Sequence, residues 1–253
     1  MDMPTKRADF DAADMAHWTG MVTRLLKGAP VESLDRFDED GLVTNAFYPV
    51  PSPGEAPLPL LPMNAARRLV EGWRVVQTVP ADMGNAEILD ALMSGATGLM
   101  LSNADEDALA SQLQGVMLKA ISIDLEAGAA TGSHYHRLLS MAGADASGIW
   151  IDLGLDPVRD LAAGLALHGD APNAHRLFRI DGWHWHNRGL TAAQELGLIT
   201  AGFVAVLRAA DSHGVDVAAM AGRLSARLAL PADMFAGIAG CRAVRRLWDG
   251  VLA

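Results

Sequence analysis

The first 62 residues contain a helical pattern followed by a proline-rich segment. Apolar positions predict a helix over residues 9–27, with an apolar face formed by Trp18, Met21, Val22, Leu25 and Leu26. Gly28 follows as a stop signal. Prolines crowd residues 49–62, and we expect residues 30–62 to form an extended arm because proline is incompatible with a regular helix interior. Such an arm usually lies on a surface of its own chain or of a partner.

From residue 67 onward, short β-rich runs alternate with amphipathic helical patterns. The predicted strands are residues 73–79, 97–102, 119–125, 148–154, 177–185 and 223–230. The predicted helices are residues 85–95, 105–117, 132–142, 157–168, 191–213 and 232–252. Strands that alternate with helices predict a parallel sheet, and the regular unit length favours a TIM-type (β/α) barrel over a doubly wound sheet.

The predicted architecture is α/β, with an N-terminal helix and extended arm over residues 1–62 and a barrel or part-barrel over residues 63–253. A complete TIM barrel has eight strand-helix units, and about six are recognisable here, so the barrel is expected to be incomplete. No Gly-x-Gly-x-x-Gly motif follows the first strand, which weakens a dinucleotide-binding interpretation. Unclosed strand edges favour association, and we expect the chain not to be monomeric.

Composition narrows the possible partners. Of the 253 residues 51% are hydrophobic, enough for a large core, and the formal net charge is −10. That charge argues against nucleic acid as a partner. It does not exclude a small anionic ligand such as an acyl-CoA, because local arginines can bind such a ligand. Cys241 is the single cysteine, the N-terminus is too acidic for a signal peptide, and no apolar run approaches ~18 residues, so we expect a cytoplasmic protein without a membrane segment.

Two His-x-His pairs are candidate metal ligands. His184 and His186 fall on the predicted fifth strand, where alternate side chains share a face at a spacing that suits a divalent metal. His134 and His136 form the second pair, after the third strand. Aspartates on or near neighbouring strands could complete a metal-dependent TIM-barrel hydrolase site: Asp124, Asp152 and Asp181. Against this interpretation, the two pairs lie in different strand-helix units.

Several segments, taken together, resemble the barrel domain of the methylmalonyl-CoA mutase family. The most specific are GWH followed by RG-x-T-AAQELG (residues 182–197), and RLS followed by IAGCRAVRRLW (residues 223–248). Weaker matches are the Leu-Lys-Gly leader near residue 26, PGEAP at 53–57, GWRVVQ at 72–77 and GLDPV at 154–158, the last of which is similar to the small, non-catalytic subunits. The resemblance implies a barrel subunit that pairs with a catalytic chain and works with adenosylcobalamin on acyl-CoA thioesters.

The departures from the family are as informative as the matches. Catalytic chains carry Thr-Ile-Arg-Gln-Tyr-Ala-Gly at the first strand and turn, where the Arg holds the acyl-CoA and the Tyr presses on the radical site. Here Val76 replaces that Arg and Thr78 replaces that Tyr, while Gln77 is retained. The cobalamin-binding signature Asp-x-His-x-x-Gly is missing, and the nearest string, residues 211–216, lacks its closing Gly. The resemblance therefore implies a chain with no mutase activity of its own.

His184 is the candidate catalytic residue, because it aligns with the family's histidine that hydrogen-bonds the thioester carbonyl. If it ends a strand, alternation predicts that it faces the barrel axis, with Asp181 nearer the start of that strand and with Trp183 and Trp185 outward against the next helix. The opposite interpretation is an inherited histidine in a silent site. The leading hypothesis is a non-catalytic mutase subunit or fragment; the alternatives are the metal-dependent hydrolase and a stand-alone acyl-CoA-binding protein.

Overall fold

The computed structural model describes residues 14–49, 73–102, 106–126, 128 and 131–253. The chain divides into two units, Met1–Leu60 and Leu61–Ala253, each considered by itself. The division at residue 62 into an N-terminal part and a barrel domain stays a prediction. The part of the predicted proline-rich arm from residue 50 to residue 62 lies outside the described residues.

The N-terminal unit contains one helix and a small hairpin. Helix α1 (Met15–Leu25) begins at Asp14, whose side chain accepts a hydrogen bond from the backbone N–H of His17, and this confirms the predicted helix. A single 3-10 turn η1 (Val31–Leu34) leads into the antiparallel pair β1 (Arg36–Phe37) and β2 (Val43–Thr44). The hairpin was not predicted, so the first part of the expected arm is more regular than its prolines suggested.

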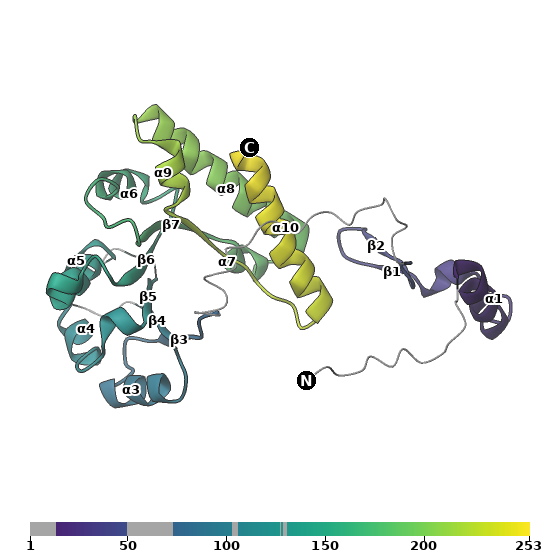
Figure 1. Cartoon of the computed structure of the whole chain (residues 1–253), viewed down its shortest axis with the longest axis horizontal. Coiled ribbons are helices and arrows are strands. Elements are labelled where there is room, and N and C mark those ends of the chain that lie inside the picture. Colours follow the sequence, from purple (N-terminus) through teal and green to yellow (C-terminus); the bar gives the residue numbers. More distant parts are fainter. Residues whose placement is uncertain (1–13, 50–72, 103–105, 127, 129–130) are drawn as a thin grey trace, which may run out of the picture. The chain divides into compact units, whose positions relative to one another are not determined.

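The second unit is built on a parallel sheet in which each strand pairs with the next one along the chain (Figure 1). Within the described residues the order is β3 (Val76–Val79), β4 (Gly98–Leu101), β5 (Ser122–Leu125), β6 (Trp150–Leu155), β7 (Arg176–Asp181) and β8 (Leu224–Arg227). Sequential parallel order is the order of a TIM-type barrel. The six-stranded sheet is consistent with the predicted incomplete barrel, with β3 and β8 at its edges.

Helices connect successive strands, and a further helix follows the last strand, β8 (Figure 1). They are α3 (Asn85–Met93), α4 (Glu106–Gln112), α5 (Thr131–Ala142), α6 (Leu161–Leu167), α7 (Gly182–His186), α8 (Ala192–Ser212), α9 (Val217–Ala221) and α10 (Met234–Leu252), with 3-10 turns η2 (Leu118–Ala120) and η3 (Gly143–Asp145). The six predicted helices are confirmed. The short helices α7 and α9 were not predicted, because five residues are too few to show a helical period.

The hydrophobic core lies between the sheet and this helical layer. On β7, Phe178 and Ile180 point to the helices: a Cβ on Gly164 of α6 would meet the Phe178 ring at 2.1 Å, and a Cβ on Gly202 of α8 would meet Ile180 at 2.7 Å. Glycine at these points therefore lets both helices approach the strand closely. The alternate residue Arg179 points to the opposite face, which we call the inner face of the sheet.

Helix α8 is the central helix of this layer. It begins with a capping box in which Thr191 and Gln194 exchange side-chain and backbone hydrogen bonds, and Gly214 follows its end with φ +71°. Among the described helices it alone is long and apolar enough to cross a membrane by length and composition. Because Ile199, Phe203 and Val206 are buried in the core, we interpret α8 as a barrel-layer helix.

Candidate functional site

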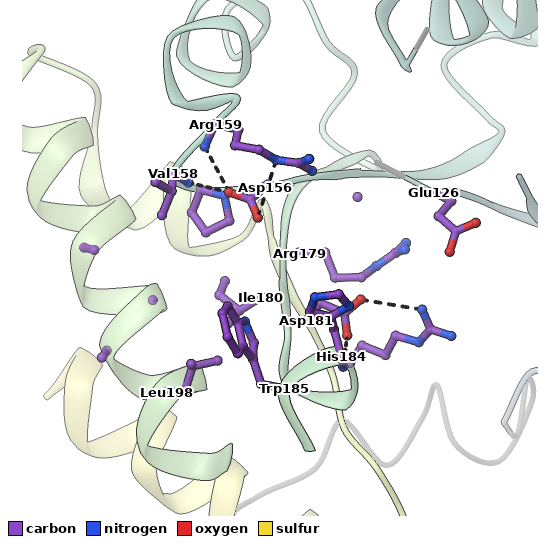
Figure 2. Close-up of a pocket in the computed structure, with 16 residues that line it drawn as sticks. Glu126, Asp156, Val158, Arg159, Arg179, Ile180, Asp181, His184, Trp185 and Leu198 are labelled. Carbon is purple, nitrogen blue, oxygen red and sulfur yellow. Dashed lines mark hydrogen bonds and ion pairs between the residues drawn. The ribbon is translucent and has the colours of Figure 1, made fainter. Parts of the chain in front are cut away.

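The carboxyl ends of the strands border a cleft of about 970 Å³, which Figure 2 shows. Side chains come from the end of β7 (Arg179, Ile180, Asp181), from α7 (His184, Trp185), from β8 (Arg227), from the loop after β6 and from one face of α8. The carboxyl ends of parallel strands are where the active sites of TIM-type barrels lie. This cleft is therefore the candidate functional site of the second unit.

Arg179 joins two aspartates on the inner face of the sheet. Its Nη2 lies 3.0 Å from Asp124 Oδ1 and 3.0 Å from Asp152 Oδ1, and its Nε donates to Asp152 Oδ2 at 3.3 Å. All three side chains are largely buried, with 8%, 14% and 3% of their surfaces exposed for Arg179, Asp124 and Asp152. Burial outweighs the attraction of Arg179 and raises the pKa of Asp124 to about 6. The cluster is a closed ion-pair network across β5, β6 and β7.

A bulge in β6 shapes the floor beside this network. The register between β6 and β7 shifts between Asp152 and Leu155, and Gly154 has φ +61°. Asp152 Oδ1 accepts the Gly154 N–H at 2.9 Å, and Arg179 Nη1 donates to the Leu125 carbonyl at 3.2 Å. A Cβ on Gly154 would lie 2.3 Å from that carbonyl oxygen, so only glycine fits here. The bulge and the network hold each other in place.

The candidate catalytic residue His184 lies on a helix and not on a strand, which corrects the prediction. Strand β7 ends at Asp181, whose Oδ1 accepts the backbone N–H of His184 at 3.0 Å and so caps α7. Asp181 is thus at the end of the strand and not near its start. The His184 ring is exposed at the edge of the cleft, 5.6 Å from the Trp185 ring in an edge-on contact. A ring N–H placed there can reach a bound carbonyl.

The predicted outward packing of the two tryptophans is likewise wrong, because the alternation of a strand does not apply to a helix. The Trp183 ring lies under the Arg227 guanidinium, 4.1 Å from the centroid, and 40% of the residue is exposed. Arg227 Nη1 is also 3.6 Å from Asp181 Oδ2. Trp185 is 45% exposed and forms part of the cleft wall. Both rings therefore lie at or near the cleft and not in the hydrophobic core.

Glu195 is a site residue that sequence reasoning missed. It is 3% exposed in the first turn of α8, where its Oε2 lies 3.2 Å from His186 Nδ1 and its Oε1 accepts the Ala229 N–H at 2.8 Å. It therefore ties α7 to the segment after β8. The only signal in the sequence was a charged residue on the apolar face of α8, beside Leu198 and Ile199 in the helical projection.

The hydrolase alternative is not favoured. His134 and His136 lie on α5, where side chains two residues apart point to different sides of the helix. His186 contacts Glu195, and Asp124 and Asp152 are both paired with Arg179. No group of three or more metal-ligating side chains lies together in the described part of the chain.

The two positions where the family's catalytic groups are expected lie on β3. Val76 shares the inner face with Ser122, since a Cβ on the intervening Gly98 would meet both side chains, and Thr78 follows on the same face by alternation. The string that partly resembles the cobalamin signature ends α8: His213 Nδ1 contacts the Ala209 carbonyl oxygen at 2.8 Å. That histidine therefore belongs to a helix end.

Fold and site together define a parallel α/β protein of the TIM-barrel type with a charged cleft at the carboxyl ends of its strands. A family model described as Methylmalonyl-CoA mutase matches residues 167–253. The chain is 31% identical to the "Probable methylmalonyl-CoA mutase small subunit" of Mycobacterium tuberculosis (strain H37Rv) and to that of Mycobacterium bovis, over 99% of this chain and 47% of each relative. It is 30% identical to the "Methylmalonyl-CoA mutase small subunit" of Streptomyces virginiae, over 96% of this chain and 46% of the relative.

Residues 167–253 thus match the methylmalonyl-CoA mutase family, and nearly the whole chain is similar to small subunits of that enzyme. It spans about half the length of the curated relatives it matches. The family match covers α7, α8, β8 and α10, the elements that carry the two most specific sequence resemblances.

Proposed function

We propose that this chain is the barrel part of a non-catalytic small subunit of a methylmalonyl-CoA mutase and that it pairs with a catalytic mutase chain. The names of its relatives support a small subunit. One structural observation carries the non-catalytic role: the inner face of β3 presents Val76 and Thr78 where a catalytic chain of the family has Arg and Tyr. Neither side chain can supply a planar guanidinium or an aromatic wedge.

His184 is the residue of this chain that we expect to contact an acyl thioester. It lies at the edge of the cleft, where its imidazole could donate a hydrogen bond to a thioester carbonyl and so favour negative charge on that oxygen. Asp181 fixes its backbone through the cap of α7, and Trp185 fixes one edge of its ring. Without the Arg and Tyr, this contact supports binding and not turnover.

The mutase family is generally cobalamin-dependent, and adenosylcobalamin supplies its radical chemistry when bound. The described residues of this chain do not fit that group. Val76 and Thr78 offer no large donor or aromatic surface, and the Nδ1 of His213 is engaged by a backbone carbonyl at the end of α8. We therefore assign any cofactor to the partner chain and derive no step through it.

The pairing is tested by co-expression with a large mutase chain from the same source. We expect the two chains to elute together on size exclusion and to dissociate only under denaturing conditions. Separate elution at micromolar concentration of both chains contradicts the proposal. This chain alone should scatter light above its 26.7 kDa monomer mass, because β3 and β8 present strand edges.

The absence of activity is tested separately. Incubated alone with adenosylcobalamin and methylmalonyl-CoA, the chain should form no succinyl-CoA above the rate without protein. Turnover by the chain alone would show that groups other than the expected Arg and Tyr catalyse the reaction. We place the complex in the cytoplasm, which the single cysteine, Cys241, supports.

A further inference from the structure

The side of the cleft that faces α8 is apolar and is used by none of the ion pairs described above. Helix α8 presents Leu198, Ala201, Gly202 and Ala205, spaced so that they share one helical face. Ile180 of β7 lies opposite, and Trp185 stands beside it, as Figure 2 shows. Gly202 packs directly against Ile180, whereas Ala201 and Ala205 are exposed and leave the cleft open beside this contact.

The length of this apolar side suits an extended aliphatic chain. From Leu198 to Ala205 the helix rises about 10 Å, which is close to the length of an extended chain of about eight carbons. The total cleft volume of about 970 Å³ lies at the upper end of the range for small-molecule sites. A linear aliphatic chain therefore fits along α8 and leaves room for a polar end group.

The polar side of the cleft has no excess of positive charge, because Glu126, Asp156 and Asp181 line it together with three arginines. Arg179 is paired with two buried aspartates, and Arg227 lies near Asp181. Asp156 accepts the backbone N–H groups of Val158 and Arg159 and lies 4.0 Å from the Arg159 guanidinium. Because each of these cations already has a carboxylate beside it, the site offers hydrogen-bond donors without a net positive field. An uncharged acceptor is favoured over an anion.

We propose that this cleft binds a linear aliphatic chain of about six to ten carbons along α8, with an uncharged carbonyl, as in a thioester or ester, at its polar end near His184. The chain lies against Leu198, Ala201 and Trp185. The inference rests on the proposed function for the thioester class and on the cleft alone for the aliphatic chain. It gives this subunit a ligand distinct from the short acyl group in the family's name.

The test uses neutral N-acetylcysteamine thioesters of propionic, hexanoic, octanoic and decanoic acid, titrated into the purified chain by isothermal calorimetry. Affinity should increase from propionyl to octanoyl by up to about fourfold for each added methylene. Octanoate should bind at least about tenfold more weakly than the octanoyl thioester, because each cation described in the cleft is already paired with a carboxylate. Equal affinity for propionyl and octanoyl thioesters, or for octanoate and its thioester, overturns the proposal.

Two variants locate the binding. Ala201→Phe and Ala205→Phe each fill the apolar side from an exposed position of α8, and each should weaken octanoyl thioester binding at least about tenfold. Ala192→Phe is the matched control: it is exposed on the same helix, outside the cleft, and should bind like the wild type. Far-UV circular dichroism and a thermal melt confirm that the variants fold. Unchanged binding by both cleft variants refutes the proposal.

This experiment separates the two proposals. Binding is measured on the chain alone, so it does not need the catalytic partner. Binding without pairing leaves the ligand site and contradicts the subunit role. If the chain pairs with the mutase chain but its affinity for thioesters does not depend on acyl length, the subunit role stands and the ligand site is refuted.

Discussion

The buried network around Arg179 makes the sharpest prediction about stability. Replacing Arg179 with Met keeps most of the side-chain volume and removes the charge. Asp124 and Asp152 are then left buried without a cation, since Arg179 provides both of their ion pairs among the described residues. Breaking a buried pair from one side costs about 3–5 kcal/mol in unfolding free energy at neutral pH. The loss of the hydrogen bond to the Leu125 carbonyl acts in the same direction.

Arg159→Met is the matched control for that variant. Its ion pair with Asp156 spans 4.0 Å, and 65% of the Arg159 side chain is exposed. Exposed pairs contribute about 0–1 kcal/mol. Arg159→Met should therefore be close to the wild type in the same assay.

The assay is urea unfolding followed by far-UV circular dichroism at pH 7.5 and at pH 5. Arg179 lowers the pKa of Asp124, so without it the carboxylates take up protons more readily in the folded state. The destabilisation of Arg179→Met should then shrink at pH 5. Adding Asp152→Asn to Arg179→Met should recover part of the loss. A cost below about 1 kcal/mol, or one that is the same at both pH values, refutes a charged buried network.

Four further results follow from single positions. Because burial raises the pKa of Asp124 from 3.8 to about 6, the wild type should lose stability relative to Asp124→Asn as the pH rises from 4 to 6, measured by thermal melts across that range. Gly154→Ala should cost at least about 2 kcal/mol, because φ is +61° and the Cβ meets the Leu125 oxygen, and a melt equal to the wild type's would show that the bulge relaxes. Glu195→Ala should cost about 1–3 kcal/mol in urea unfolding, because the Ala229 N–H loses its acceptor. His184→Ala should cost below about 1 kcal/mol, and Trp183→Ala less than the ~3–5 kcal/mol of a buried aromatic because 40% of it is exposed, with thermal melts of both variants as the check.

Much of the barrel architecture could be predicted because its signals are local and repeated. Residues 97–102 have an apolar centre and residues 119–125 have alternating apolar residues, both over the length of one strand, and each run is followed by a helical period. Strands in such alternation must be parallel, so six units were enough to indicate a barrel-type sheet. Gly95 and Gly214 follow the predicted helix ends with φ +114° and +71°. The hairpin in residues 36–44 was not predicted, because strands of two residues are too short to show an alternating pattern.

The error at residues 177–185 has a definite physical cause. The run alternates apolar or aromatic residues with polar ones for most of its length, so its pattern favours a single strand. Asp181 decides the matter by accepting the His184 N–H, which starts α7 directly after β7. The Asp-Gly step was the available signal, because Asp is a preferred helix N-cap. Once the segment is helical, His184, Trp183 and Trp185 no longer alternate between two faces.

The sequence by itself determined the order of strands and helices, because this order depends on residue type and local spacing. The tertiary structure alone decided which charges meet. Asp124, Asp152 and Arg179 are far apart along the chain, and parallel pairing of β5, β6 and β7 places them on one face. It also decided that the cleft has an apolar side along α8, because Ala201 and Ala205 of that helix line the cleft. Contacts between distant segments depend on register and packing, which no local pattern contains.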